Sequence, residues 1–303
     1  MRILETTGSD ELATVYVAAL DDKAERIVEF VQSTQPPVPS DQKLVLIVST
    51  MLGCPVECLM CDAGGNFHGK LSKDEIMEQI DFLIKKQFNG NKITVPKLKI
   101  QFARMGEPAF NPAVIDVMTE LPEKYDAPGL MPCISTIAPA GAKKFFDRLL
   151  EVKQKYYNNG MFQLQFSIHT TDQEERDRII PCKKWSFEQI AEFGQRWFTP
   201  NDRKITLNFA PIKGMTLDPN VIREHFHPDK FAIKLTPVNP TYRRSETGIE
   251  PVIETEESPE GRKLQAEFEA LGYDVILSIG ELAENKIGSN CGFYVSRLKR
   301  NQQ

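Results

Sequence analysis

Three of the six cysteines lie within eight residues, as Cys54-Pro-Val-Glu-Cys58-Leu-Met-Cys61. The remaining three stand alone in the chain, at Cys133, Cys182 and Cys291. A closed structural zinc site or an ordinary iron–sulfur site uses four protein ligands, so three cysteines leave one metal position open for a substrate. This spacing predicts a catalytic iron site.

A second interpretation of the same residues is a closed zinc site. His68 lies seven residues after Cys61 and could supply a fourth ligand. With its metal fully coordinated, the chain would be a non-catalytic, metal-stabilised binding module. Spacing alone leaves both interpretations open.

Composition narrows the class of protein. The chain has 303 residues, and 41% of them are hydrophobic, which is enough for a full core. It carries 37 basic and 42 acidic residues, a formal net charge of -5, which argues against a broadly cationic nucleic-acid binder. No apolar stretch approaches the roughly 20 residues of a membrane span, and acidic residues stand where a signal peptide would be apolar. We expect a cytoplasmic protein with reduced thiols.

The cysteines need a scaffold, and strand-like and helix-like segments alternate through most of the chain. The strand-like runs are Leu44 to Ser49, Leu98 to Ala103, Pro132 to Ile137, Phe162 to Ile168, Ile205 to Ala210 and Phe231 to Thr236. The helix-like stretches are Ser72 to Lys86, Pro112 to Leu121, Ala140 to Tyr157, Ser186 to Trp197 and Pro219 to His225. This order predicts an α/β fold, a partial (β/α)6 barrel, although an open doubly wound sheet fits the same order.

The segments outside these units define the expected domain boundaries. Residues 1–43 contain alternating runs and predict a small N-terminal β extension before the barrel of residues 44–240. Residues 241–303 predict a C-terminal α/β extension, which carries Cys291. Cys54 follows the first barrel strand after Gly53, so the three thiols should meet at the mouth of the barrel.

Further motifs follow the cysteines in a fixed order along the chain. They are Met105-Gly106-Glu107-Pro108, Ser135 to Pro139, Phe166-Ser167-Ile168-His169, Pro211 to Gly214 and Pro237-Val238-Asn239-Pro240. Together with the Cys-x3-Cys-x2-Cys motif, they resemble the RlmN/Cfr-type radical S-adenosylmethionine (SAM) methyltransferases, which methylate an adenine carbon in RNA. The resemblance runs from about Leu44 to Phe293.

The resemblance implies two cofactors and a set of binding residues. Cys54, Cys58 and Cys61 would ligate a [4Fe-4S] cluster whose open iron binds SAM. The residues that would hold SAM are Gly106, Glu107, Ser135, Ser167, His169 and Asn239. Without the family, the polar members of this set are ordinary loop residues or, for His169, a satisfied half-buried histidine. An external donor, flavodoxin-like or ferredoxin-like, would supply electrons.

The resemblance is incomplete at the cysteines that complete the family's reaction. Cys291, within Asn290-Cys291-Gly292, resembles the thiol that carries the methyl group. The family's second cysteine, which releases the product, would stand at position 47, and here that residue is Ile47. Cys133 is the nearest candidate substitute and Cys182 a weaker one, although a lone cysteine in a strand is more often buried packing.

Two enzyme hypotheses therefore remain beside the zinc module. The first is methylation of an sp2 carbon in a nucleic-acid or nucleotide-like substrate through Cys291. The second is hydrogen abstraction from a small molecule without methyl transfer. The family's helical N-terminal RNA-binding region has no counterpart in the sequence, which weakens a claim of RNA binding. The basic residues near the end are either a solvated face or a local phosphate contact; they are Arg297, Lys299 and Arg300, with Arg243 and Arg244 in a preceding loop.

Overall fold

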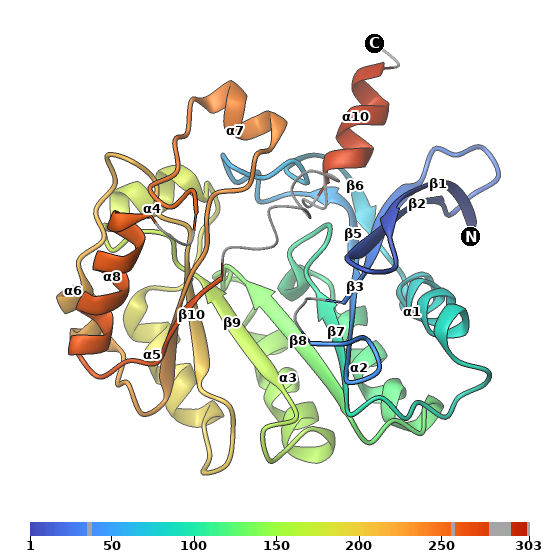
Figure 1. Cartoon of the computed structure of the whole chain (residues 1–303), viewed down its shortest axis with the longest axis horizontal. Coiled ribbons are helices and arrows are strands. Elements are labelled where there is room, and N and C mark those ends of the chain that lie inside the picture. Colours follow the sequence, from blue (N-terminus) through green and yellow to red (C-terminus); the bar gives the residue numbers. More distant parts are fainter. Residues whose placement is uncertain (35–37, 256–257, 279–291, 302–303) are drawn as a thin grey trace.

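One mixed sheet organises the molecule (Figure 1). The computed structural model describes residues 1–34, 38–255, 258–278 and 292–301. Seven parallel strands form most of the sheet: β4 (Lys43–Val48), β7 (Lys97–Phe102), β8 (Leu130–Thr136), β9 (Gln163–Ser167), β10 (Ile205–Phe209), β11 (Phe231–Leu235) and β12 (Val275–Leu277). The six predicted strands correspond to β4 through β11 in this row. The α/β prediction is thus confirmed, and β12 adds a seventh parallel strand.

The N-terminal residues extend the same sheet in antiparallel fashion. The strands β1 (Arg2–Ser9), β2 (Ala13–Ala19) and β3 (Ile27–Ser33) pair in order, and β3 pairs with β4. The expected β extension therefore has three strands and continues the sheet. The sheet runs from β1 to β12 as an open, curved layer rather than a closed barrel.

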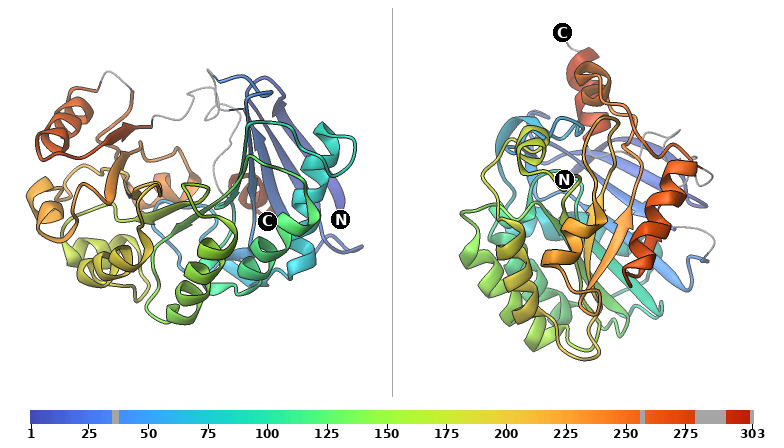
Figure 2. Two further views of the ribbon diagram at one scale, coloured as in Figure 1. Left: turned by 90° about the horizontal axis from the view of Figure 1, so that it is seen from below. Right: turned by 90° about the vertical axis from the view of Figure 1, so that its left-hand side faces the viewer.

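Helices cover the convex side of this sheet (Figure 2). They are α1 (Lys73–Gln87), α2 (Ala113–Lys124), α3 (Lys143–Tyr156), α5 (Phe187–Trp197), α6 (Pro219–His225) and α8 (Pro259–Ala270). Ser72 and Ser186 begin α1 and α5 as capping boxes with Glu75 and Gln189, so local sequence fixes where these helices start. Within the described ranges, no helix combines the length and the apolar character needed to cross a membrane.

The main hydrophobic core lies between the helices and the convex face. Along β4, for example, Leu44, Leu46 and Val48 belong to this core, whereas Lys43 and Ile47 are half-buried on the other face. That other face, the concave face, is formed by the alternate residues of the strands. It is polar over much of the parallel sheet, which is unusual for strands of an α/β protein.

Several short elements were not predicted from the sequence. They are the hairpin of β5 (Met51–Cys54) and β6 (Gly65–Lys70), the 3-10 turn η1 (Pro108–Phe110), and the helices α4 (Gln173–Ile179), α7 (Tyr242–Thr247) and α10 (Phe293–Asn301). All are at most nine residues long, so their hydrophobic periodicity is too short to read. Most of them lie at the carboxyl ends of the parallel strands, toward the top of Figure 1.

A buried ion pair connects α10 to the sheet. Glu29 on β3 is 0% exposed and lies 2.9 Å from Nε of Arg104, which is itself buried after β7. The Glu29 carboxylate also accepts hydrogen bonds from the backbone amides of Gly292, Tyr294 and Val295. Glu29 therefore caps the N-terminus of α10 with a negative charge, where a helix favours one.

Removal of this carboxylate should loosen the attachment of α10. Glu29→Ala would leave Arg104 buried without this carboxylate and three amides without their acceptor, so we expect a loss of about 3–5 kcal/mol in the free energy of unfolding. Urea denaturation measures this loss. Glu246→Ala removes the partner of the exposed Arg300 and should cost less than about 1 kcal/mol. Equal losses in the two variants would contradict the role given to Glu29.

Candidate functional site

The three clustered cysteines lie at the end of β5 and in the loop that connects β5 to β6. Cys54 is the last residue of β5, and Gly53 before it has a φ of +72°, a conformation that favours glycine. The pairing of β5 with β6 shifts register between Leu52 and Cys54, so Gly53 lies at an irregularity of the strand just before the first cysteine. Cys61 donates its amide to the carbonyl of Cys58 at 3.2 Å, which closes a tight turn between these two cysteines. All three cysteines are half-buried.

Burial controls the chemistry of these thiols. Desolvation raises the pKa of Cys54 to about 11, although the backbone amides of Val56, Glu57 and Glu107 favour its thiolate. Desolvation, with Cys54 and Glu107 nearby, raises the pKa of Cys58 to about 12. These thiols are protonated at neutral pH, so a metal would have to displace their protons.

Glu107 lies beside the cysteines because the Met105–Gly106 turn packs on the end of β4. The amides of Thr50 and Met51 donate to the Met105 carbonyl. Gly106 has a φ of +97°, and a Cβ there would lie 2.6 Å from the side chain of Met51. Only glycine fits this close approach.

The Glu107 carboxylate is buried at the carboxyl end of β8. It accepts hydrogen bonds from the amides of Ala109 and Ile137 and from the hydroxyl of Thr136. Desolvation nevertheless raises the pKa of Glu107 to about 7. A buried carboxylate of this kind is stabilised by a cationic partner such as an ammonium group. The sequence did not point to Thr136, which holds Glu107 in place.

The other predicted SAM-binding residues lie at neighbouring strand ends. Ser135 and Ser167 are half-buried near the ends of β8 and β9, and Asn239 is exposed after β11. Strand ends of a parallel sheet meet at one edge, and the structure brings these residues to the edge that carries the cysteines.

His169 follows β9 with a φ of +69°. Its Nδ1 accepts the amide hydrogen of Ala210 at 3.1 Å. Desolvation, followed by the charge of Arg176, lowers the pKa of His169 to about 4, so the ring is neutral at pH 7. A neutral ring with an accepting Nδ1 carries its hydrogen on Nε2, which leaves Nε2–H as a donor.

The cysteine loop suits a cluster with one open iron. It carries three thiols, and the backbone amides of Val56, Glu57 and Glu107 favour the thiolate of Cys54. Among the described residues, however, no three His, Cys, Asp or Glu side chains are already grouped as a metal site. His68 is exposed on β6 and does not complete such a group. In the described residues, therefore, neither a closed site with His68 nor a site of the three cysteines alone is already assembled.

Asp62, which directly follows Cys61, ties two C-terminal helices to the cysteine loop. Its carboxylate accepts the amides of Tyr242 and Arg243 at the start of α7, and its carbonyl accepts the Ser296 hydroxyl on α10. Tyr242 and Phe293 stack with ring centroids 5.0 Å apart, so the two helices contact each other. The cysteine motif did not by itself point to Asp62, although the position of Asp62 directly after the last cysteine was a signal.

The predicted carrier, Cys291, lies outside the described residues, but the next residue is described. Gly292 has a φ of +80°, and a Cβ there would lie 2.3 Å from the backbone nitrogen of Ala63. Gly292 therefore packs directly on the backbone that follows Cys61. This contact requires glycine, in agreement with the Asn-Cys-Gly sequence.

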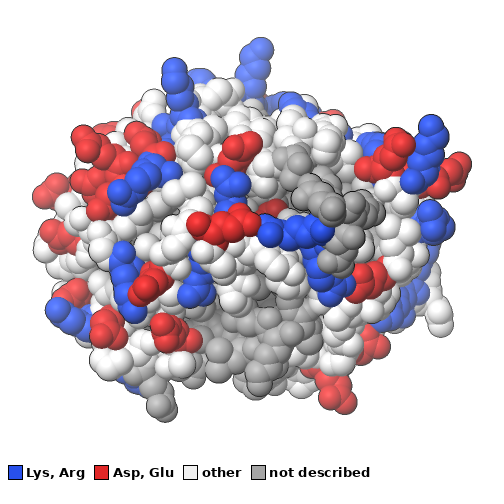
Figure 3. Space-filling view, turned by 90° about the horizontal axis from the view of Figure 1, so that it is seen from above, with Lys and Arg blue, Asp and Glu red and all other residues white. Residues whose placement is uncertain are grey.

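Three basic residues of the C-terminal extension make internal contacts. Arg297 pairs with Glu5, Arg300 pairs with Glu246, and Arg244 donates to the carbonyls of Val238 and Ile249. On the face above α7 and α10, basic and acidic side chains are intermingled (Figure 3). The arrangement agrees with the interpretation as a solvated face rather than as a phosphate contact.

Two remaining cysteines lie in different surroundings. Cys182 is half-buried and packs against the apolar cluster that also contacts Cys54 and Cys58. Cys133 is buried on the concave face of β8, where desolvation raises its pKa to about 11. In the sheet register Ile47 pairs with Gln101, and Gln101 pairs with Cys133. Cys133 thus shares a row with Ile47, two strand spacings or about 10 Å away.

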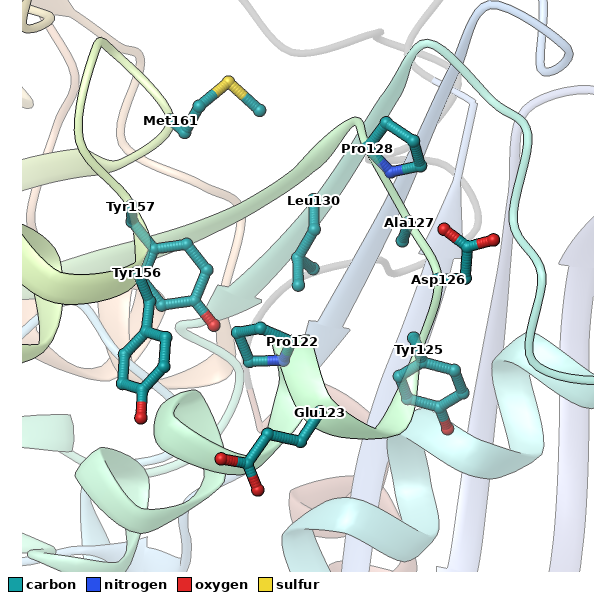
Figure 4. Close-up of a pocket in the computed structure, with 10 residues that line it drawn as sticks. All are labelled: Pro122, Glu123, Tyr125, Asp126, Ala127, Pro128, Leu130, Tyr156, Tyr157 and Met161. Carbon is teal, nitrogen blue, oxygen red and sulfur yellow. The ribbon is translucent and has the colours of Figure 1, made fainter.

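A cavity of about 480 Å³ lies away from the cysteines (Figure 4). Tyr125, Tyr156, Tyr157 and Met161 are among its lining residues. These residues follow α2 and α3 and precede β8 and β9, so the cavity opens at the amino ends of the strands. It contains none of the predicted site residues.

The burial of His169 predicts a pH dependence of stability. Between about pH 6.5 and pH 4 the unfolded chain binds a proton that the folded chain excludes, so stability is lost as the pH falls. Between pH 7 and pH 5, the free energy of unfolding of wild type should fall by about 1–2 kcal/mol more than that of His169→Asn, as measured by urea denaturation. Asparagine tolerates the positive φ. The free energy of unfolding of His227→Asn, a change at an exposed loop position, should instead depend on pH as it does in wild type. A pH-dependent difference of similar size in His227→Asn would contradict the role given to the burial of His169.

The chain is similar in sequence to curated proteins that are named as RNA methyltransferases. The chain is 30% identical over 200 residues to a probable dual-specificity RNA methyltransferase RlmN from Desulfitobacterium hafniense, covering 64% of this chain and 53% of that protein. It is 27% identical over 197 residues to the RlmN of Marinobacter nauticus, covering 62% and 50%. The chain thus spans about half the length of the curated relatives it matches. No family model matches the chain.

Solved structures share the fold. A radical SAM methyltransferase from Sphaerobacter thermophilus superposes with a TM-score of 0.69 over 96% of this chain and 80% of that one, at 16% identity. Streptococcus suis SuiB superposes with a TM-score of 0.51 over 79% of this chain and 49% of that one, at 15% identity. The chain is thus similar in sequence to RlmN proteins over about three fifths of its length, and it shares its fold with the solved methyltransferase structure.

Proposed function

We propose that this chain is a radical SAM enzyme that transfers a methyl-derived carbon to an sp2 carbon of a nucleic-acid or nucleotide-like substrate. The observation that carries this proposal is the packing of Gly292 on the backbone after Cys61, because it ties the segment of the predicted carrier to the cysteine loop. The curated relatives, named as RNA methyltransferases, support the same reaction class. Residues 44–240 would form the barrel and residues 241–303 the carrier segment, with residues 1–43 as the β extension.

The residues at the strand ends would hold the cofactors. Cys54, Cys58 and Cys61 would bind a [4Fe-4S] cluster, which would supply the open iron and the electron that split SAM. Glu107 would accept the SAM ammonium group, which offsets the cost of its burial. The Nε2–H of His169, with Ser135, Ser167 and Asn239, would position the remaining polar groups of SAM.

Cys291 would accept the methyl group by nucleophilic displacement. Its thiolate attacks the methyl carbon of SAM, a sulfur–carbon bond forms, and S-adenosylhomocysteine leaves with the electron pair of the broken bond. The thiol proton goes to solvent. A second SAM, held by the same residues, would supply the radical that activates this S-methyl carbon, and Cys291 would present that carbon to the substrate.

Cys133 would release the product in place of the cysteine that position 47 lacks. Its thiolate would attack the Cys291 sulfur, so that a disulfide forms and the sulfur–carbon bond breaks. The electron pair of the broken bond stays with the methylene carbon, which takes a proton and becomes a methyl group. The ring carbon then loses its own hydrogen as a proton, and the unpaired electron left by the radical addition goes to an external one-electron acceptor. An external thiol or electron donor must then reduce the disulfide. The row that Cys133 shares with Ile47 supports this role.

Methylation of Cys291 is the direct test of the proposed reaction. Protein loaded with iron and sulfide without air, then incubated with SAM and reductant, should gain one methyl group on the Cys291 peptide, detected by mass spectrometry. Cys58→Ser should abolish the modification, because it removes a cluster ligand. His68→Ala should retain it, because His68 is exposed and is not grouped with the cysteines.

Two outcomes would redirect the assignment. Production of 5'-deoxyadenosine with an unmodified Cys291 would favour the hydrogen-abstraction enzyme. Binding of one zinc ion, lost in His68→Ala, with no iron or sulfide bound would favour the non-catalytic module.

A variant at Cys133 tests the release step. With substrate present, Cys133→Ala should accumulate a covalent adduct between protein and substrate, seen as a mass increase of the intact chain, while turnover falls by about 100-fold or more. Cys182→Ala makes the same chemical change outside the row of Ile47 and should release product normally. Unchanged turnover in Cys133→Ala removes Cys133 from the reaction.

A further inference from the structure

Four lysines lie on the concave face, on strands that are far apart in the sequence. Lys43 belongs to β4, Lys97 and Lys99 to β7, and Lys234 to β11. Lys43 pairs in register with Lys97, so both side chains lie on one face. Alternation places Lys99 on the same face, and the Coulombic influence of Lys99 on Lys43, Lys97 and Lys234 indicates that all four charges are close. We call these residues the lysine cluster.

The lysine cluster has no carboxylate partner among the described residues. The acidic group beside it is the Cys133 thiol, whose pKa is raised by desolvation to about 11. Lys99 is only 8% exposed, and the other three are half-buried, yet none forms an ion pair or a side-chain hydrogen bond in the described ranges. Elsewhere in the chain, the buried Lys153 is paired with Asp202. Burying a charge is costly unless it is paired, so an unneutralised cluster indicates a charged ligand.

Burial and the neighbouring positive charges lower the pKa values of three of these lysines. Desolvation and then the charge of Lys99 lower the pKa of Lys234 to about 8. Desolvation also lowers the pKa of Lys43 and of Lys97, again with like charges as the next cause. The fold therefore holds these cations together at a cost, which an anion would offset.

Neutral polar side chains surround the lysine cluster. Asn208, which pairs in register with Lys234, is 8% exposed, and its Oδ1 has no hydrogen-bond partner among the residues that the structure describes. Gln163 and Thr206 lie on the same face of the neighbouring strands. Such a surface provides donors and acceptors for a polar ligand in addition to the positive charges.

The position of the cluster relates it to the candidate site. Lys99 lies three residues before the end of β7, about 10 Å below the strand ends that carry the cysteines and Glu107. A ligand held by the cluster could therefore extend toward the reacting groups. The arginines at the rim already pair internally, which argues against a long nucleic-acid strand as the ligand.

We infer that the lysine cluster binds the phosphate groups of a small polyanion, of the class of nucleoside di- and triphosphates, inside the concave face. Phosphates match the chemistry, because lysine ammonium groups bind them as point charges. That this ligand is the methylated substrate rests on the proposed function. The binding of the polyanion does not.

Direct binding measurements test the inference. Inorganic tripolyphosphate and ATP should bind the full chain in calorimetry, adenosine should bind far more weakly, and added salt should weaken the phosphate ligands. The double variant Lys99→Met/Lys234→Met should weaken tripolyphosphate binding by about tenfold or more. The matched control, Lys85→Met/Lys144→Met, removes the same charge from exposed helix positions and should bind like wild type.

Stability provides a second readout that separates binding from misfolding. The cluster variant should unfold at the same or a higher urea concentration than wild type, because it removes buried like charges. Loss of binding together with unchanged or increased stability supports the inference. Equal binding by the cluster and control variants, or binding of a single-stranded RNA that tripolyphosphate does not displace, would overturn it.

The result is independent of the proposed reaction. Tripolyphosphate binding needs neither iron nor SAM, so it would persist in a chain that fails to methylate Cys291. Conversely, a chain that methylates Cys291 but does not bind tripolyphosphate keeps its proposed function and loses this inference.

Discussion

The buried carboxylate of Glu29 is the constraint on which the architecture of the candidate site depends. A fully buried carboxylate needs an ion pair and hydrogen bonds to offset the loss of its hydration. Glu29 forms an ion pair with Arg104 and accepts hydrogen bonds from three amides at the start of α10. Glu29 itself lies on β3, and its partners come from the turn that leads to Glu107 and from the C-terminal helix. One charge therefore fixes three distant segments around the mouth of the sheet, and the cysteine loop lies among them.

The parallel sheet and the cysteine loop were predictable because their signals are local. The strands from β4 to β11 are apolar runs, and the spacing of Cys54, Cys58 and Cys61 is visible in eight residues. Ser72 and Ser186 cap their helices with neighbours three residues away. Each of these features follows from short-range physical chemistry.

The elements that cover the site depend on partners far away in the chain. The start of α7 is held by Asp62, about 180 residues earlier, and α10 by Glu29, more than 260 residues earlier. Arg297 was interpreted from its charge as a possible phosphate contact, but the fold gives it Glu5. The lysine cluster was missed for the same reason, since only the curvature of the sheet brings Lys43 and Lys234 to one surface. Alternation of lysine in β7 was a signal, because a strand covered by helices on both faces would be apolar.

The double attachment at Asp62 has a consequence for the biosynthesis of the protein. Ser296, which binds the Asp62 carbonyl, leaves the ribosome 234 residues after Asp62. At about 5–20 residues per second, this delay is on the order of 10 to 50 seconds. During that time Cys54, Cys58 and Cys61 are already synthesised, but α10, which contacts the cysteine loop at Asp62, is not yet in place. Delivery of iron and sulfide from a carrier would therefore meet an open loop during translation and a covered one afterwards.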